Sequence, residues 1–116
     1  MTKPMRALSV CQPFAEQILS GEKRIEYRSI LTNLRGRVYI YASKRERKDV
    51  YAKIKVAPGT YPTGVIVGTV EVVGCRKKGE GDYHWLLANP IRAKRKLRPK
   101  GIPQPVWFYP FKSATA

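Results

Sequence analysis

A lysine, a glutamate and an arginine stand close together in this chain, at Lys23, Glu26 and Arg28. An arginine held by a carboxylate presents a fixed fork of hydrogen-bond donors, which suits planar or anionic ligands better than a free lysine does. If burial shifted their pKa values, the lysine and the glutamate could instead act as general base and general acid. The spacing therefore predicts a small polar site, either for binding or for acid–base chemistry.

A strand, a helix and a second strand are expected to position these side chains. Over residues 14–20, apolar residues recur four positions apart, which predicts one buried helical face. Gln12 can cap this helix, and Gly21 ends it, because glycine enters the left-handed conformation without strain. Residues 24–28 alternate as a strand does, so Glu26 is expected between two arginines on one strand face.

The rest of the chain is expected to form strands separated by turns. The segment 38–42 is apolar on both faces and predicts a central strand, whereas 44–55 predicts a weak, exposed helix. A long strand over 65–73 is expected to bend at Gly68, and a last strand is expected around Trp107. Several strands with turn signals between them indicate a barrel or a closed sheet.

The segment from Ser9 to Arg28 fits the pattern S-x-x-Q-P-x-A-x-x-I-x-x-G-x-K-x-x-E-x-R, which resembles the activating-signal-cointegrator homology (ASCH) domain. The likeness continues in order along the chain and covers roughly residues 6–111. It implies a single α+β domain with a PUA-like fold, a small β-barrel with flanking helices, and short termini at 1–5 and 112–116. It also implies a cleft that bears the G-x-K-x-x-E-x-R residues and has been linked to RNA or other nucleic acid.

Composition points independently to an anionic partner. The chain has 23 Lys and Arg residues against 8 acidic ones, a net charge of +15 on 116 residues. Such an excess indicates nucleic acid, RNA or DNA, with single strands among the candidates. A merely solvated surface, a membrane surface or an acidic protein remain the alternatives.

Three clusters of basic residues are candidates for phosphate contacts. The third is expected in a loop between Pro90 and Pro99, with a solvated, disordered loop as the alternative. The clusters are Lys44, Arg45, Arg47 and Lys48; then Arg76, Lys77 and Lys78; then Arg92, Lys94, Arg95, Lys96, Arg98 and Lys100.

Aromatic side chains are the second requirement for holding single-stranded bases, because bases stack on them. Most of them alternate within strands, and we expect those rings in the core. Trp85, beside His84 and the basic segments, and Tyr61, in a proline-rich loop, are the better candidates for stacking.

Three interpretations of the lysine, glutamate and arginine remain open. In the first, Arg24, Glu26 and Arg28 form a paired charge row on a solvated sheet face. In the second, Lys23 and Arg28 hold a phosphate or base edge while Glu26 orients them. In the third, the site is enzymatic. The third follows from the resemblance, since some bacterial ASCH proteins look like N4-acetylcytidine amidohydrolases, with a lysine matched by Lys23 and a threonine where this chain has Glu26. Other relatives have been described as ribonucleases. We favour binding, and assign Lys23 and Glu26 as catalytic only if the protein is an enzyme.

The candidate nucleic-acid-binding residues follow from the motif and the clusters. Two cysteines and one histidine, Cys11, Cys75 and His84, are too few for a zinc site, so no metal or cofactor is expected. We expect reduced, buried thiols, with a disulfide between them left open. No apolar run reaches the ~18 residues of a membrane span and no signal peptide is visible, so we expect a cytoplasmic protein, a monomer, without membrane contact. The candidates are Ser9, Gln12, Lys23, Arg24, Glu26, Arg28, Lys44, Arg45, Arg76, Lys77, Lys78, Trp85, Arg92, Lys94, Arg95, Lys96 and Arg98.

Overall fold

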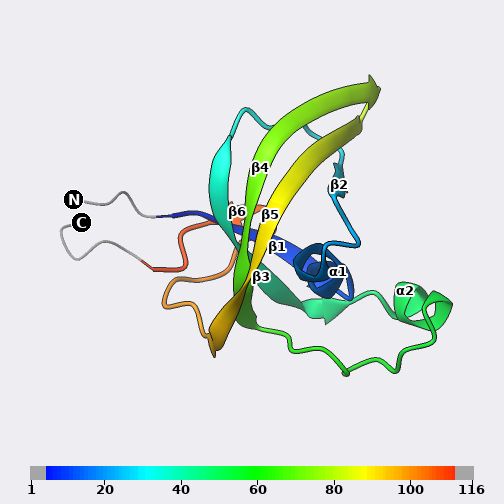
Figure 1. The fold of residues 1–116 in the computed structure, drawn as a ribbon, viewed down its shortest axis with the longest axis vertical. Coiled ribbons are helices and arrows are strands. Elements are labelled where there is room, and N and C mark those ends of the chain that lie inside the picture. The colour runs from blue at the N-terminus through cyan, green and yellow to red at the C-terminus, as the bar shows by residue number, and fades with distance from the viewer. Residues whose placement is uncertain (1–4, 112–116) are drawn as a thin grey trace.

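A computed structural model describes residues 5–111, which form one curled sheet and two short helices (Figure 1). The expected short termini therefore lie almost entirely outside the described residues. In chain order the elements are β1 (Ala7–Gln12), α1 (Phe14–Ser20), β2 (Ile25–Arg28), β3 (Gly36–Glu46), α2 (Lys48–Lys53), β4 (Val65–Gly79), β5 (Asp82–Leu97) and β6 (Trp107–Phe108).

The sheet has the strand order β2-β5-β4-β3-β1-β6. β1 and β3 run parallel, as a strand–helix–strand crossover requires, and the other neighbouring pairs are antiparallel. The long strands β4 and β5 curve together through the molecule, and α2 lies at its periphery (Figure 1). The sheet is therefore a half-barrel, and the predicted α+β class and the central position of β3 are confirmed.

Helix α1 covers the inner face of this half-barrel. Its buried residues Ala15, Ile18 and Leu19 join the main core cluster with residues of β1, β3, β4 and β5. The helix ends at Gly21, whose φ of +88° is left-handed, and the Gly21 N–H donates to the Ile18 carbonyl. The predicted helix and its glycine stop are confirmed. The apolar residues whose spacing predicted the helix are the ones that it buries.

Gly68 has no side chain, so both β5 and α1 can approach its backbone closely. A β-carbon at this position would overlap the carbonyl oxygen of Ile91 and would lie 2.7 Å from Cδ2 of Leu19. The β4–β5 register shifts beside it, between Ile66 and Gly68. The predicted bend is confirmed, and it lets β5 and α1 pack directly against the backbone of β4.

Two predicted boundaries are wrong. The helix expected within 44–55 is shorter, because residues 44–46 extend β3, where Glu46 pairs with Gln12. The loop expected from Arg92 onward is a strand through Leu97, held by backbone pairing with β4. The sequence did not predict this strand because charged side chains lie on both of its faces. Pairing with β4 stabilises it, and it has no apolar face of its own that a pattern could reveal.

Neither helix in the described range has the length and apolar character of a membrane-spanning helix.

Candidate binding cleft

A cleft of about 710 Å³ opens between β1, the start of α1, β2, the end of β3 and the segment 103–105. One carboxylate, that of Glu26, lies among its lining residues. Five cationic side chains share the lining with it: Lys23, Arg28, Lys44, Arg45 and Arg47. The motif residues and part of the first basic cluster therefore meet in one place, although about twenty residues separate them in the sequence.

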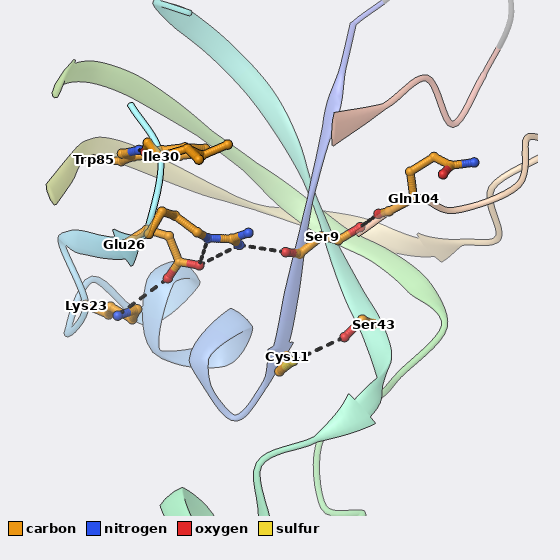
Figure 2. Close-up of polar contacts among 9 residues, drawn as sticks. Ser9, Cys11, Lys23, Glu26, Ile30, Ser43, Trp85 and Gln104 are labelled. Carbon is orange, nitrogen blue, oxygen red and sulfur yellow. Dashed lines mark hydrogen bonds and ion pairs between the residues drawn. The ribbon is translucent and has the colours of Figure 1, made fainter. Parts of the chain in front are cut away.

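Glu26 is buried and ion-paired on both oxygens. Its side chain is 8% exposed, with Nζ of Lys23 at 3.5 Å from Oε1 and Nη2 of Arg28 at 2.6 Å from Oε2. Nε of Arg28 also donates to Oε2 at 2.9 Å (Figure 2). The interpretation of a charged row on a solvated face is therefore wrong. β2 turns its charged face inward and its apolar face outward, because burial of this carboxylate is offset by two cationic partners.

Arg28 ties β2 to the rest of the cleft. Its Nη2 donates to the carbonyl oxygen of Ser9 on β1 at 2.8 Å, and its guanidinium lies 5.5 Å from the ring centroid of Trp85. The hydroxyl of Ser9 in turn donates to the carbonyl of Gln104 (Figure 2). The guanidinium is thus held in one orientation, as recognition of a planar or anionic group requires.

Lys23 sits between two aromatic rings. Its ammonium lies 4.7 Å from the ring centroids of both Phe14 and Tyr27, within the range of cation–π attraction. Burial lowers the pKa of Lys23, and the charge and hydrogen bond of Glu26 oppose that shift. Lys23 is therefore a partly desolvated cation that faces the cleft.

Two predicted contacts, Gln12 and Arg24, do not line the main cleft. Gln12 is 1% exposed and works inside the fold, since Nε2 donates to the Pro62 carbonyl and Oε1 accepts from the N–H of Glu16. This caps α1 as predicted and leaves no free amide for a ligand. Arg24 is exposed and lines two smaller hollows instead of the main cleft. The main cleft therefore uses neither side chain.

The two aromatic candidates are also engaged within the fold. Trp85 has no exposed surface, and its indole N–H donates to the Ile30 carbonyl at 2.9 Å (Figure 2). Its assignment as a nucleic-acid contact is wrong, because a ring in the core cannot stack on a base. Tyr61 stacks on Tyr51, with centroids 5.9 Å apart. Neither ring lines the cleft.

The basic clusters divide between the cleft and the outer surface. Arg76, Lys77 and Lys78 are exposed near the β4–β5 turn, where Lys77 pairs with Glu80. In the third cluster Arg92 forms two hydrogen bonds to Glu16, so it braces β5 against α1. Within the described residues no acidic group lies within 4 Å of four exposed members of that cluster: Lys94, Arg95, Lys96 and Arg98.

The sequence reasoning missed part of the cleft wall. Gln104, with a proline on each side, lines the cleft and gave no periodic signal that could have placed it there. Cys11 also lines it, with Sγ 3.6 Å from the hydroxyl of Ser43 (Figure 2). Both cysteines are free, and they are half-buried where full burial was expected. In residues 5–111 no group of three or more potential metal ligands comes together.

The curled half-barrel with its two short helices has the PUA-like fold of small α+β domains. The family model of the ASCH domain matches residues 8–97, and the chain belongs to the ASCH family.

Activating signal cointegrator 1 is similar to the chain in sequence. The human (Homo sapiens) protein is 28% identical over an alignment 125 positions long, and the mouse (Mus musculus) protein is 27% identical over the same alignment length. Each alignment covers 86% of this chain and 21% of the relative, so the chain spans about a fifth of the length of these relatives.

Two solved structures share the fold. The crystal structure of ASCH from Zymomonas mobilis superposes with a TM-score of 0.62 at 16% identity, covering 91% of this chain and 87% of that one. A point mutant of the same Zymomonas mobilis protein gives a TM-score of 0.61 at 15% identity, covering 92% and 90%. At this identity the likeness concerns the fold alone, and it confirms the predicted PUA-like architecture.

Proposed function

We propose that this protein binds nucleic acid, RNA or DNA, through the cleft and the basic surface around it. The observation that carries the proposal is the lining of the cleft, which contains five cationic side chains and only one carboxylate, itself buried. Its volume of about 710 Å³ lies in the range of sites that enclose a small ligand such as a nucleotide. A net charge of +15 supports an anionic ligand.

Within the cleft the cations divide into fixed and exposed groups. Arg28 is oriented by Glu26 and by the Ser9 carbonyl, so it suits a base edge or a phosphate approached in one direction. Lys44 and Arg45 are exposed and, among the described residues, have no acidic partner within 4 Å. They supply the flexible charges that hold a sugar–phosphate backbone.

The outer clusters extend this positive surface. The exposed lysines and arginines of β5 and of the end of β4 release counterions when they meet phosphates, which strengthens binding to every sequence. We therefore assign the sequence-independent part of the affinity to these clusters. We assign the preference for one nucleic acid over another to the cleft.

The test is a fluorescence-anisotropy titration against matched single- and double-stranded RNA and DNA at two salt concentrations. We expect binding that weakens steeply with salt, and a further loss when Lys44 and Arg45 are both changed to Gln. Lys53→Gln with Lys55→Gln on and beside α2 removes the same charge away from the cleft and serves as the control. Absence of binding at low salt would overturn the proposal.

A second candidate function is hydrolysis of a modified nucleoside, and one observation favours it. Burial lowers the pKa of Lys23, which moves a lysine toward the range of a general base. Against it, both oxygens of Glu26 are paired with cations, and the family's threonine is missing at this position. Release of cytidine from N4-acetylcytidine by the wild type, but not by Lys23→Ala, would establish this activity.

A further inference from the structure

We infer that Tyr27 is the platform on which one unpaired nucleobase stacks, and that Arg76 holds a neighbouring phosphate. The ligand at this point of the surface is therefore single-stranded. The inference rests on the proposed nucleic-acid binding and adds to it a position, a contact type and a strand state.

Tyr27 is exposed where a strand residue of its size is ordinarily covered. It lines the cleft and is 59% exposed, although it lies inside β2. Glu26 before it and Arg28 after it point inward, so the pleat turns Tyr27 outward. The ring is an aromatic surface at the rim of a cationic cleft.

The ring is also held in place. Tyr27 pairs with His84 across the β2–β5 ladder, and the two rings meet edge to face with centroids 4.7 Å apart. Lys23 approaches the same ring from within the cleft at 4.7 Å. A ring fixed before binding loses little conformational freedom when a base stacks on it.

Arg76 lies on the same face of the sheet. It pairs with His84 across the β4–β5 ladder, so Tyr27, His84 and Arg76 form one row over three strands. Since neighbouring strands are about 4.8 Å apart, Arg76 starts about 10 Å from Tyr27 along this row. Arg76 is exposed, and in the described part of the chain no carboxylate lies within 4 Å of it.

An exposed ring of this kind selects single strands. In a duplex both faces of a base are covered by its neighbours, whereas an unpaired base can turn out and stack on a protein ring. β2 is an edge strand of the sheet, so the chain of a ligand can pass Tyr27 without crossing another strand. The opposite row, Glu26, Trp85 and Cys75, faces inward, toward the core and the interior of the cleft, and carries no exposed ring.

The test compares tyrosine variants on a labelled single-stranded RNA or DNA and on its duplex. Because stacking contributes about 1–3 kcal/mol per base, Tyr27→Ala should weaken single-strand binding about 5- to 150-fold. Tyr27→Phe should retain wild-type affinity, since the ring is kept. Tyr109→Ala removes another exposed tyrosine, 44% exposed and in contact with Arg6, and should change nothing.

A second variant tests the phosphate contact. Arg76→Gln should lower the slope of log affinity against log salt by about 0.7 on the single strand, the value for one lost phosphate contact. Arg6→Gln, an equal change of charge at the far edge of the sheet, should leave the slope unchanged. An unchanged slope for Arg76→Gln would remove Arg76 from the inferred site.

The outcomes separate the inference from the function beneath it. Wild-type binding with no effect of Tyr27→Ala, or with equal losses on single strand and duplex, would overturn the inference and leave nucleic-acid binding standing. No binding of the wild type to any nucleic acid would overturn the proposed function itself. A thermal unfolding curve for each variant shows that a loss of binding is not a loss of fold.

Discussion

The side chain of Arg28 crosses from β2 to β1, where its Nη2 donates to the carbonyl oxygen of Ser9 at 2.8 Å. The same nitrogen lies 2.6 Å from the carboxylate of Glu26. Because the Ser9 hydroxyl holds the Gln104 carbonyl, one guanidinium connects two strands and, through Ser9, the segment that closes the cleft. The site residues therefore also stabilise the fold.

Replacing Arg28 should destabilise the protein. Arg28→Ala leaves the buried Glu26 with only Lys23 at 3.5 Å, and removing one partner of a buried ion pair costs about 3–5 kcal/mol. We expect a loss at the lower end of this range, because Lys23 still compensates part of the charge. Urea unfolding followed by tryptophan fluorescence measures it.

The matched control is Arg24→Ala, since Arg24 is exposed and is not among the ion-pair partners of Glu26 in the described residues. It should change the free energy of unfolding by less than about 0.5 kcal/mol. Equal effects of the two substitutions would contradict a structural role for the Arg28 contacts.

Lys23 should make stability depend on pH in the alkaline range. Burial lowers its pKa below the ordinary 10.5, so between the lowered pKa and 10.5 the unfolded chain binds more protons at this residue than the folded one. The free energy of unfolding then rises with pH across that window. Unfolding curves from neutral pH toward 10.5 should show the wild type gaining stability relative to Lys23→Met.

Lys53→Met provides the reference for this pH series, since Lys53 is exposed on α2. Lys53→Met removes the same charge without removing a partner of Glu26, so it controls for the change of net charge. If Lys23→Met behaved in the same way, the lysine would be as well solvated in the fold as in the unfolded chain.

Charge removal on β5 should act on affinity alone. Lys94→Gln with Lys96→Gln should weaken binding to all nucleic acids by the same factor and reduce the salt slope by about 1 to 2. Lys23→Ala, inside the cleft, should instead change the preference among ligands. Anisotropy titrations over a salt series distinguish the two, and equal, sequence-blind losses from both variants would refute this division.

Gly68 should not tolerate a methyl group. Its β-carbon would overlap the Ile91 carbonyl and approach Leu19 to 2.7 Å, so Gly68→Ala should cost about 1–3 kcal/mol by overpacking. At Gly79 an added β-carbon meets nothing within 4 Å, so Gly79→Ala is the control. Thermal unfolding should separate the two clearly, and a Gly68→Ala protein as stable as the control would contradict the packing.

Local signals in the sequence were sufficient for α1, its glycine stop and the bend at Gly68. Each depends on a short-range cause, either a 3.6-residue apolar period or the conformational freedom of glycine. The overall fold was predicted from the resemblance to the ASCH family. The periodicity of the sequence indicated a barrel or a closed sheet, but it could not distinguish one barrel topology from another.

The site was only partly predictable, because its geometry depends on contacts between distant segments. Alternation placed Glu26 and Arg28 on one strand face, but it could not tell which face would be covered. The same ambiguity applies to the aromatic rings: Trp85, a predicted stacking candidate, lies in the core, whereas Tyr27 is exposed. The strand that contains Lys94 escaped prediction because pairing with β4 defines it.

The end of β5 has one further consequence. Residues 91–97 pair with β4 on one side only, because β2 accompanies β5 no further than Leu86 in the described structure. Such an open backbone edge is a template to which a second chain can add. Here it carries Arg92, Lys94 and Lys96, so two copies laid edge to edge would place like charges opposite one another. Under the function we propose, these charges attract an anionic polymer, and the same charges disfavour edge-to-edge pairing of two copies.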